Sequence, residues 1–338
     1  MEAAKQRSRT TRGLLAGSIM AVCFFTYNTL SLQLKTDTHI DVLLHGGGLA
    51  PEQYRIGVIV AAAWITRLTG LAMYRSLSVL LCASLIFASF CLLHLLEQRT
   101  FFRRASAAMQ WFGSAVFVLL FLYYLQWLNF YGRPETLPSM AILAAMLWLW
   151  SLPADRVRST RSKVLITGTL VLLASLLGFI RADLAISVNA GVWIACLMRR
   201  SEGLSLGRGW ALGASALSAL SAGTIQLYLM RVVYQHTTYG TVRTFMLTFN
   251  LTEPREWLAF AVFLLPLAWM VVQIRRLRFT CAGPDLAFLS GAGLFGVLWM
   301  SMGKIDEVRI FLPFASALIP LTVEVALRTV TDPVEQAG

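Results

Sequence analysis

Acidic and basic residues of this chain stand close together in short connections between long apolar runs. Arginine binds a phosphate group through fixed, charge-assisted donors, and a carboxylate can act as general base on a hydroxyl group. Together these residue types suit a site that handles a phosphate-bearing ligand. The residues concerned are Arg133 and Glu135, Arg181 and Asp183, and Lys304, Glu307 and Arg309.

A longer polar connection, residues 35–75, adds three carboxylates that are candidates for the general base. Asp41 or Asp37 is the preferred candidate, and Glu52 is the third. The candidate phosphate-binding residues are Arg55, Arg181, Arg309 and Lys304. The residues expected to orient them are Asp183, Glu307, Arg133 and Glu135.

These pairs also have a purely structural interpretation. Arg181 and Asp183 interrupt an apolar stretch that otherwise runs from residue 164 to residue 198, so they can form an internal pair that marks a tight turn. Such a pair avoids the cost of an isolated charge at the edge of a membrane. The charged residues at 304–309 can likewise form a solvated hairpin. The sequence leaves both interpretations open.

The segments that carry these connections are apolar enough to cross a membrane. Hydrophobic residues make up 57% of the 338 residues, charged residues make up only 14%, and the mean hydropathy is +0.66. Residues 164–180 and 257–274 contain no charge and have about the length of a bilayer span. A soluble domain normally contains about a quarter charged residues. The composition therefore predicts an all-α, polytopic transmembrane helical bundle.

The net charge of +12 fits the same prediction. The cytoplasmic loops of membrane proteins collect Lys and Arg, which gives such chains a basic balance. A basic chain can also bind nucleic acid, but no DNA- or RNA-binding motif accompanies the charge. No nucleic-acid partner is therefore expected.

Ten spans and one interfacial helix are predicted. Residues 54–71 are apolar but contain Arg55 and Arg67, so we expect this helix to lie along the membrane surface. With this assignment and the N-terminus inside, the connections richest in Lys and Arg fall on the cytoplasmic side. The predicted spans are residues 13–34, 76–97, 110–131, 138–152, 164–180, 183–198, 209–233, 257–274, 285–303 and 310–327.

These spans form a single membrane domain, residues 1–338, because no repeat or linker divides the chain. The tails at 1–12 and 328–338 are expected in the cytoplasm, and residues 35–75 and 234–256 form the larger outer loops. The spans at 138–152 and 183–198 are short for a hydrocarbon core of about 30 Å. Short spans predict local thinning of the bilayer or helices that end at a water-filled cavity.

Cysteine and histidine residues indicate neither a disulfide framework nor a metal centre. The five cysteines form no CxxC pair, and the four histidines are scattered along the chain. Outer acidic residues are of the type that binds divalent cations, but no ligand spacing supports a metal site. No cofactor is therefore predicted.

The layout resembles the GT-C class of integral-membrane glycosyltransferases. The segments PEQYRIGVIV, residues 51–60, and IDEVRIFLPF, residues 305–314, are similar to stretches in small bacterial membrane proteins of this pattern. The resemblance implies a catalytic Asp or Glu in the first outer loop, where Asp37, Asp41 and Glu52 lie. It also implies a sugar donor linked to polyprenyl phosphate, used on the extracytoplasmic side of a bacterial inner membrane.

Two other functions remain open on the sequence alone. A non-catalytic membrane subunit or assembly factor would use the Arg-rich loops to bind a protein partner. A transporter or flippase of a lipid-linked substrate is the other alternative. Transporters tend to show repeated halves and charges near the middle of the membrane, whereas these charges gather at one face. The expected partners are membrane lipid and a polyprenyl-phosphate-linked sugar.

Overall fold

The computed structural model describes residues 22–23, 26–29, 39–50, 52–128, 133–238, 245–303 and 307–335, without the side chains of 256 and 332–335. All regular elements among these residues are helical, as predicted. Six helices are long and apolar enough to cross a membrane. They are α4 (Met73–Gln98), α6 (Ala107–Leu125), α8 (Thr160–Ile180), α10 (Arg208–Tyr228) with its π-helical extension η3 (Leu229–Val233), α12 (Pro254–Arg276) and α13 (Gly283–Met302).

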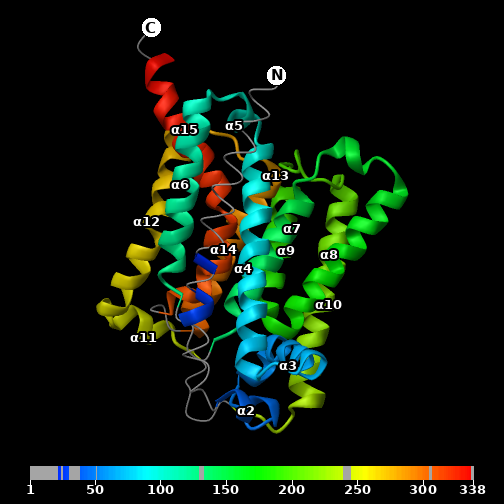
Figure 1. Ribbon diagram of the computed structural model, residues 1–338. Coiled ribbons are helices and arrows are strands. Elements are labelled where there is room, and N and C mark those ends of the chain that lie inside the picture. Colours follow the sequence, from blue (N-terminus) through cyan, green and yellow to red (C-terminus); the bar gives the residue numbers. More distant parts are fainter. Residues whose placement is uncertain are drawn as a thin grey trace.

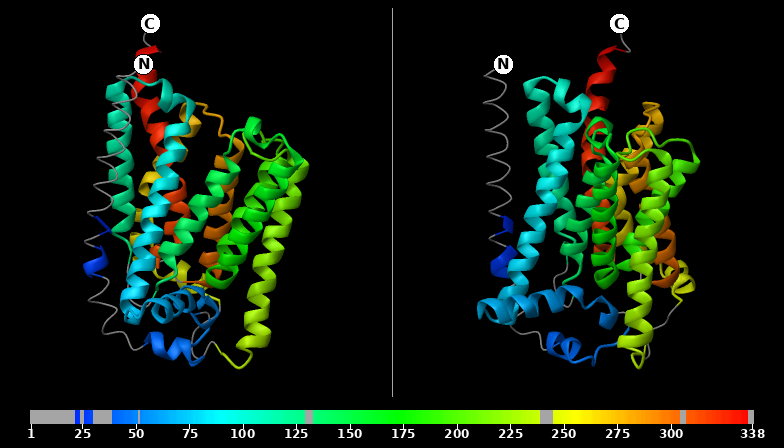
Figure 2. Two further views of the ribbon diagram at one scale, coloured as in Figure 1. Left: turned by 45° about the vertical axis from the view of Figure 1, so that its right-hand side comes forward. Right: turned by 90° about the vertical axis from the view of Figure 1, so that its right-hand side faces the viewer.

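The long helices run side by side between two ends of the molecule (Figure 1). We name these the α3 end and the α5 end, after two short helices, α3 (Gly57–Thr69) and α5 (Thr100–Arg104). Connections that the sequence assigns to the outer face lie at the α3 end, and those assigned to the cytoplasmic face lie at the α5 end (Figures 1 and 2). Most of the predicted span 13–34 lies outside the described residues.

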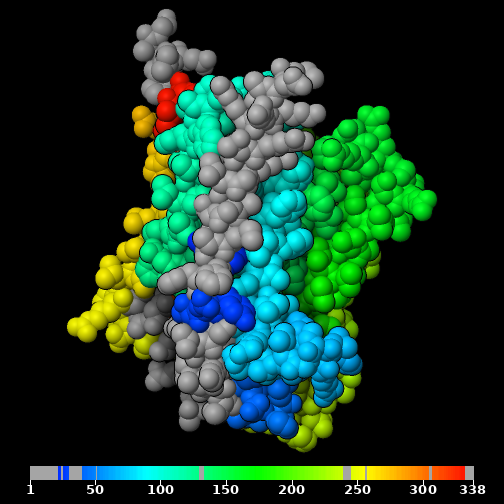
Figure 3. All heavy atoms as spheres, viewed as in Figure 1, coloured from blue at the N-terminus to red at the C-terminus, as the bar shows by residue number. Residues whose placement is uncertain are grey.

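Helix α3 lies across the end of the bundle, almost perpendicular to the long helices (Figure 2). It ends at Gly70, whose left-handed φ of 72° suits a residue without a side chain. With α2 (His39–Leu44) it forms the lower edge of the face shown as spheres in Figure 3. Residues 54–71 therefore fold into a helix that does not run along the bundle, as the sequence predicts.

Buried Gln53 joins α2 to the 3-10 helix η1 (Glu52–Arg55), which precedes α3. Its Nε2 donates to the carbonyl oxygen of Leu43 over 3.0 Å, and its Oε1 accepts from the N–H of Gly48 over 2.8 Å. These hydrogen bonds satisfy an amide group that burial would otherwise penalise. They fix η1, and with it Arg55, against the rest of the first outer loop.

Two short helices pack among the longer ones. Helices α7 (Thr136–Trp150) and α9 (Ala182–Leu197) would be only about 22–24 Å long at a rise of 1.5 Å per residue. Helix α7 is apolar all around and buried over almost its whole length, whereas α9 leaves Ile186, Trp193 and Leu197 exposed. A helix that is apolar on every face packs inside a bundle. The predicted span 138–152 thus corresponds to a core helix, and the span 183–198 corresponds to a short helix that packs on α13 and has one exposed side.

The last predicted span, 310–327, is not one straight helix. It consists of η4 (Val308–Phe311), α14 (Leu312–Ala317) and α15 (Ile319–Glu335), with a bend of 61° between the two halves. Pro320 follows the break and has no N–H to donate, so the hydrogen-bond ladder of a continuous helix cannot form there. If this bent pair is one span, the described residues contain seven candidate spans.

Close packing of α9 against α13 depends on glycine, and this gives a direct test of the fold. A methyl group on Gly191 would lie 2.8 Å from the nitrogen of Gly291 and nearer still to the carbonyl oxygen of Ala287. Gly191→Ala should therefore lower the free energy of unfolding by about 1–3 kcal/mol, the usual cost of overpacking. Thermal unfolding of the purified protein in detergent measures this change.

Gly213→Ala is the matched control, because a methyl group at Gly213 on α10 would meet no atom within 4 Å. Alanine favours a helix more than glycine does, by about 1 kcal/mol. This variant should unfold at the same temperature or higher. Equal destabilisation by both substitutions would contradict the packing of α9 on α13.

Candidate functional site

Arg181 occupies the tight turn between α8 and α9 and is almost completely buried, with 1% of its surface exposed. Its Nε donates to Oδ1 of Asp183 over 3.0 Å, and its Nη2 donates to Oδ2 of the same residue over 2.7 Å. Asp183 lies in the first turn of α9, where a negative charge is favoured by the helix dipole. The two residues therefore pair as the sequence suggested, at the α3 end of the bundle.

Aromatic rings of α13 enclose the other side of the Arg181 guanidinium. Its central carbon lies 5.5 Å from the ring centroid of Phe295 and 5.7 Å from that of Trp299. The guanidinium of Arg55 lies 5.9 Å from the same Trp299 ring. Cation–π attraction stabilises both cations in a place where water is largely excluded. Trp299 therefore brings Arg55 and Arg181 into one site.

Arg55 is bound by a carboxylate that comes from another connection. Its Nη1 lies 3.5 Å from Oε1 of Glu135, which is itself buried, just before α7. Burial lowers the pKa of Arg55, and the nearby charge of Arg181 lowers it further. The carboxylates of Asp183 and Glu135 oppose this change. Arg55 and Arg181 therefore repel each other and depend on the carboxylates around them.

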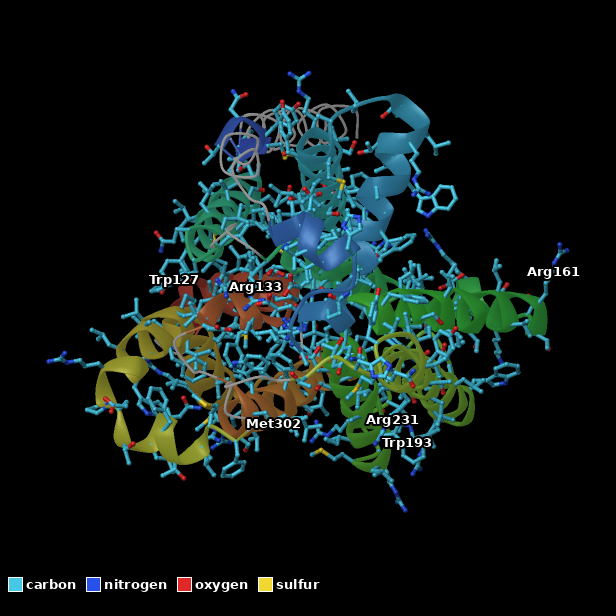
Figure 4. The ribbon with its side chains drawn as sticks, turned by 90° about the horizontal axis from the view of Figure 1, so that it is seen from below. Trp127, Arg133, Arg161, Trp193, Arg231 and Met302 are labelled. Carbon is cyan, nitrogen blue, oxygen red and sulfur yellow. The ribbon has the colours of Figure 1, made fainter. Side chains whose placement is uncertain are left out.

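Two further ion pairs complete the site. Arg133 pairs with Glu52 of η1, and Arg309 lies 3.7 Å from Glu307, measured from Nη2 to Oε1. The Nε of Arg309 is buried and has no hydrogen-bond partner among the described residues. Viewed from the α3 end, Arg133 lies within the ring of helices, whereas Arg161 points away from the bundle (Figure 4).

We call this set of residues the outer arginine cluster. Its members come from four connections that are far apart in the sequence, and each arginine has a carboxylate partner. The cluster consists of Arg55, Arg133, Arg181 and Arg309 with Glu52, Glu135, Asp183 and Glu307.

The second outer loop is tied to the same end through Asn250. This residue is fully buried in α11 (Leu247–Thr252), and its Nδ2 donates to the carbonyl oxygens of Met300 and Gly303, each over 2.7 Å. Trp257 Nε1 donates to the carbonyl oxygen of Asn250 over 2.5 Å. These bonds hold the end of α13 in place. The loop thereby supports the helix that carries Trp299.

Three of the predicted site residues lie outside the cluster or outside the described residues. Asp41 is exposed on α2, and its carboxylate forms no ion pair with any described residue. Asp37 and Lys304 are not among the described residues. Of the two candidate bases among the described residues, Asp41 and Glu52, the structure thus brings Glu52 to the arginines. No group of three or more metal-ligating side chains gathers among the described residues.

A second charged network, which the sequence analysis missed, lies at the α5 end. Arg99 donates to both oxygens of Asp285, over 2.6 Å and 2.5 Å, and to Glu324 over 3.0 Å. Glu324 also accepts from Arg328, one turn later in α15. Glu324 falls within a predicted span and Asp285 begins another. An ionisable residue inside an apolar span indicates that an oppositely charged side chain lies nearby. Glu324 is such a residue and could have indicated this network.

No protein-family model, no curated protein and no solved structure matches this chain. The function is therefore argued from the chemistry of the site itself.

Removal of a single charge from the outer arginine cluster should strongly lower the free energy of unfolding. Asp183→Asn leaves the buried Arg181 without its charged partner, and breaking a buried ion pair typically costs about 3–5 kcal/mol. Because 32% of the Asp183 side chain is exposed, we expect a smaller loss of about 2–3 kcal/mol in the free energy of unfolding.

Thermal unfolding in detergent measures this effect, with Asp155→Asn as the matched control. Asp155 lies in the 3-10 helix η2 (Ala154–Val157) at the α5 end and is exposed. Its substitution should leave the unfolding temperature unchanged. An Asp183→Asn variant as stable as this control would show that Arg181 does not depend on Asp183.

Proposed function

We propose that this protein is an integral-membrane glycosyltransferase that uses a sugar donor linked to polyprenyl phosphate. The observation that carries the proposal is the convergence of four separate connections on the outer arginine cluster. Exposed arginines would be sufficient for solubility. The nearly buried Arg181 is costly and therefore calls for a specific role. Phosphate recognition is a role that buried arginines fill.

The proposed topology has ten spans, with both termini in the cytoplasm of a bacterium and the chain in its inner membrane. The α5 end then faces the cytoplasm, because the connections there are rich in arginine. The α3 end faces outward, and α3 lies in the interface with Trp64 and Leu68 exposed to lipid. The short helices α7 and α9 count as spans in this arrangement.

The charge balance of the cluster suggests how a phosphate would bind. Every cluster arginine is paired with a carboxylate, and Arg55 and Arg181 repel each other. A phosphate between these two guanidiniums would replace repulsion with attraction on both sides. The buried Nε of Arg309 offers a further donor that no described residue uses.

Release of a carboxylate from its arginine would supply the general base. Glu52, the partner of Arg133, is partly exposed and belongs to the first outer loop. In the proposed reaction Glu52 takes the proton from the acceptor hydroxyl, and the hydroxyl oxygen forms a bond to the anomeric carbon of the sugar. The bond from that carbon to the phosphate oxygen breaks, and the cluster arginines stabilise the negative charge on the leaving phosphate.

Turnover by the full chain in liposomes tests this mechanism. The donor would be a polyprenyl-phosphate-linked sugar, and the product would be detected by mass spectrometry after addition of candidate acceptors. Loss of a general base typically lowers turnover by about 10²–10⁴-fold. We expect this loss in Glu52→Gln, with smaller effects in Asp41→Asn and Asp37→Asn.

The control is Glu202→Gln, which changes an exposed carboxylate at the α5 end and should retain full turnover. Full turnover in all three outer-loop variants would exclude the proposed base. Absence of turnover in the wild type, together with stable co-purification of one protein partner, would favour the non-catalytic subunit.

A further inference from the structure

A cavity of about 570 Å³ opens at the α5 end, opposite the outer arginine cluster. It lies between α5, the beginning of α6 and α15. Two arginines, Arg104 and Arg328, line it, and none of the described residues that line it is acidic. The cavity is therefore a basic pocket between helices, whereas the outer arginine cluster has as many acids as bases.

Arg328 is held in a fixed orientation beside this cavity. Its guanidinium lies 4.5 Å from the ring centroid of Phe101 and 4.8 Å from that of Phe279. Its Nε and Nη2 donate to Oε1 of Glu324, over 3.3 Å and 2.9 Å. No described residue accepts a hydrogen bond from its Nη1. An arginine that is already oriented loses little side-chain entropy when it binds an anion.

Arg328 also borders a second cavity, of about 330 Å³, on the side of Arg99 and Asp285. On that side the charges of Arg99 and Arg328 are balanced by those of Asp285 and Glu324 through direct contacts. Burial alone would lower the pKa of Arg99, but the two carboxylates raise it above its usual value. The positive charge that is not balanced by a described acid thus belongs to Arg104, which lines the first cavity.

Hydroxyl groups and a helix terminus make the cavity lined by Arg104 more favourable for an anion. Ser106 lines it and caps α6, with its Oγ accepting from the N–H of Met109. No described residue accepts a hydrogen bond from the Ser106 hydroxyl, which can therefore donate to a ligand. The N-terminus of a helix carries a partial positive charge and attracts phosphate. Phe101 and Met109 provide apolar surface next to these polar groups.

We propose that this cavity binds a phosphate group, held by Arg104, Arg328 and the Ser106 hydroxyl. An anionic phospholipid of the adjacent leaflet and a soluble phosphate share this chemistry. Basic pockets between transmembrane helices are known to take anionic head groups on the cytoplasmic side. The site is separate from the outer arginine cluster and does not depend on the transferase proposal.

The test is thermal unfolding of the full chain in a non-ionic detergent, with three titrants. These are a short-chain phosphatidylglycerol, a phosphatidylcholine with the same chains, and inorganic phosphate. We expect phosphatidylglycerol to raise the unfolding temperature with saturation, and phosphatidylcholine to have no effect. Arg104→Gln should weaken this binding by about fivefold to tenfold, the effect of losing one charge-assisted hydrogen bond.

Arg103→Gln is the matched control, because Arg103 is the exposed neighbour of Arg104 on α5 and does not line the cavity. It should change the affinity by less than about twofold. Arg328→Lys gives a second variant that keeps the charge but loses the fork of donors, and it should also weaken binding. Saturation by inorganic phosphate at similar affinity would assign the site to a soluble ligand, and saturation by phosphatidylglycerol alone would assign it to a lipid.

If Arg103→Gln and Arg104→Gln weaken phosphatidylglycerol binding equally, the proposal is overturned, because the binding would then depend only on the general positive charge of the surface. Equal effects of phosphatidylglycerol and phosphatidylcholine would overturn it as well, as would the absence of saturation with every titrant.

Discussion

The burial of one guanidinium, that of Arg181, constrains the whole α3 end of this protein. A charged group can be removed from water at tolerable cost only when hydrogen bonds and opposite charges replace its hydration. Asp183 supplies both, and the rings of Phe295 and Trp299 cover the remaining surface. The α8–α9 turn, the end of α13 and the first outer loop must therefore meet at one place. The buried amides of Gln53 and Asn250 hold the two outer loops in that arrangement.

The ion pairs at the two ends of the bundle differ in their geometry. At the α5 end, Arg99 forms a two-pronged pair with Asp285, so that its donors are occupied by acids of the protein. At the α3 end, Arg181 is held by Asp183 in the same two-pronged way, but two other pairs are looser: 3.5 Å separates Arg55 from Glu135, and 3.7 Å separates Arg309 from Glu307. A tight pair stabilises a fold, whereas looser pairs can exchange a carboxylate for a ligand at smaller cost. We therefore propose that the Arg55–Glu135 and Arg309–Glu307 pairs are the ones that open to admit a ligand.

Much of this arrangement could be predicted from the sequence, because it depends on local patterns. The tight turn at Arg181 is visible as a break in an apolar run, and Arg55 with Arg67 marks a helix that does not span. The bend near Leu318 was missed, since proline in an apolar run is compatible with a continuous but kinked helix. The Arg99–Asp285 pair was missed because its members are 186 residues apart, and no local pattern shows which distant charges meet. For the same reason the sequence could not show that Glu52, and not Asp41, lies beside an arginine.

Ligand binding by the outer arginine cluster is tested most directly by native mass spectrometry of the purified protein with two lipids. One is a polyprenyl phosphate and the other is the corresponding polyprenol, which has the same chain and no phosphate. If the cluster binds the phosphate, the phosphorylated lipid should bind at least about tenfold more tightly, and Arg309→Gln should remove most of that difference. Arg67→Gln, on the exposed face of α3, should preserve it. Equal binding of the two lipids by the wild-type protein would contradict the account.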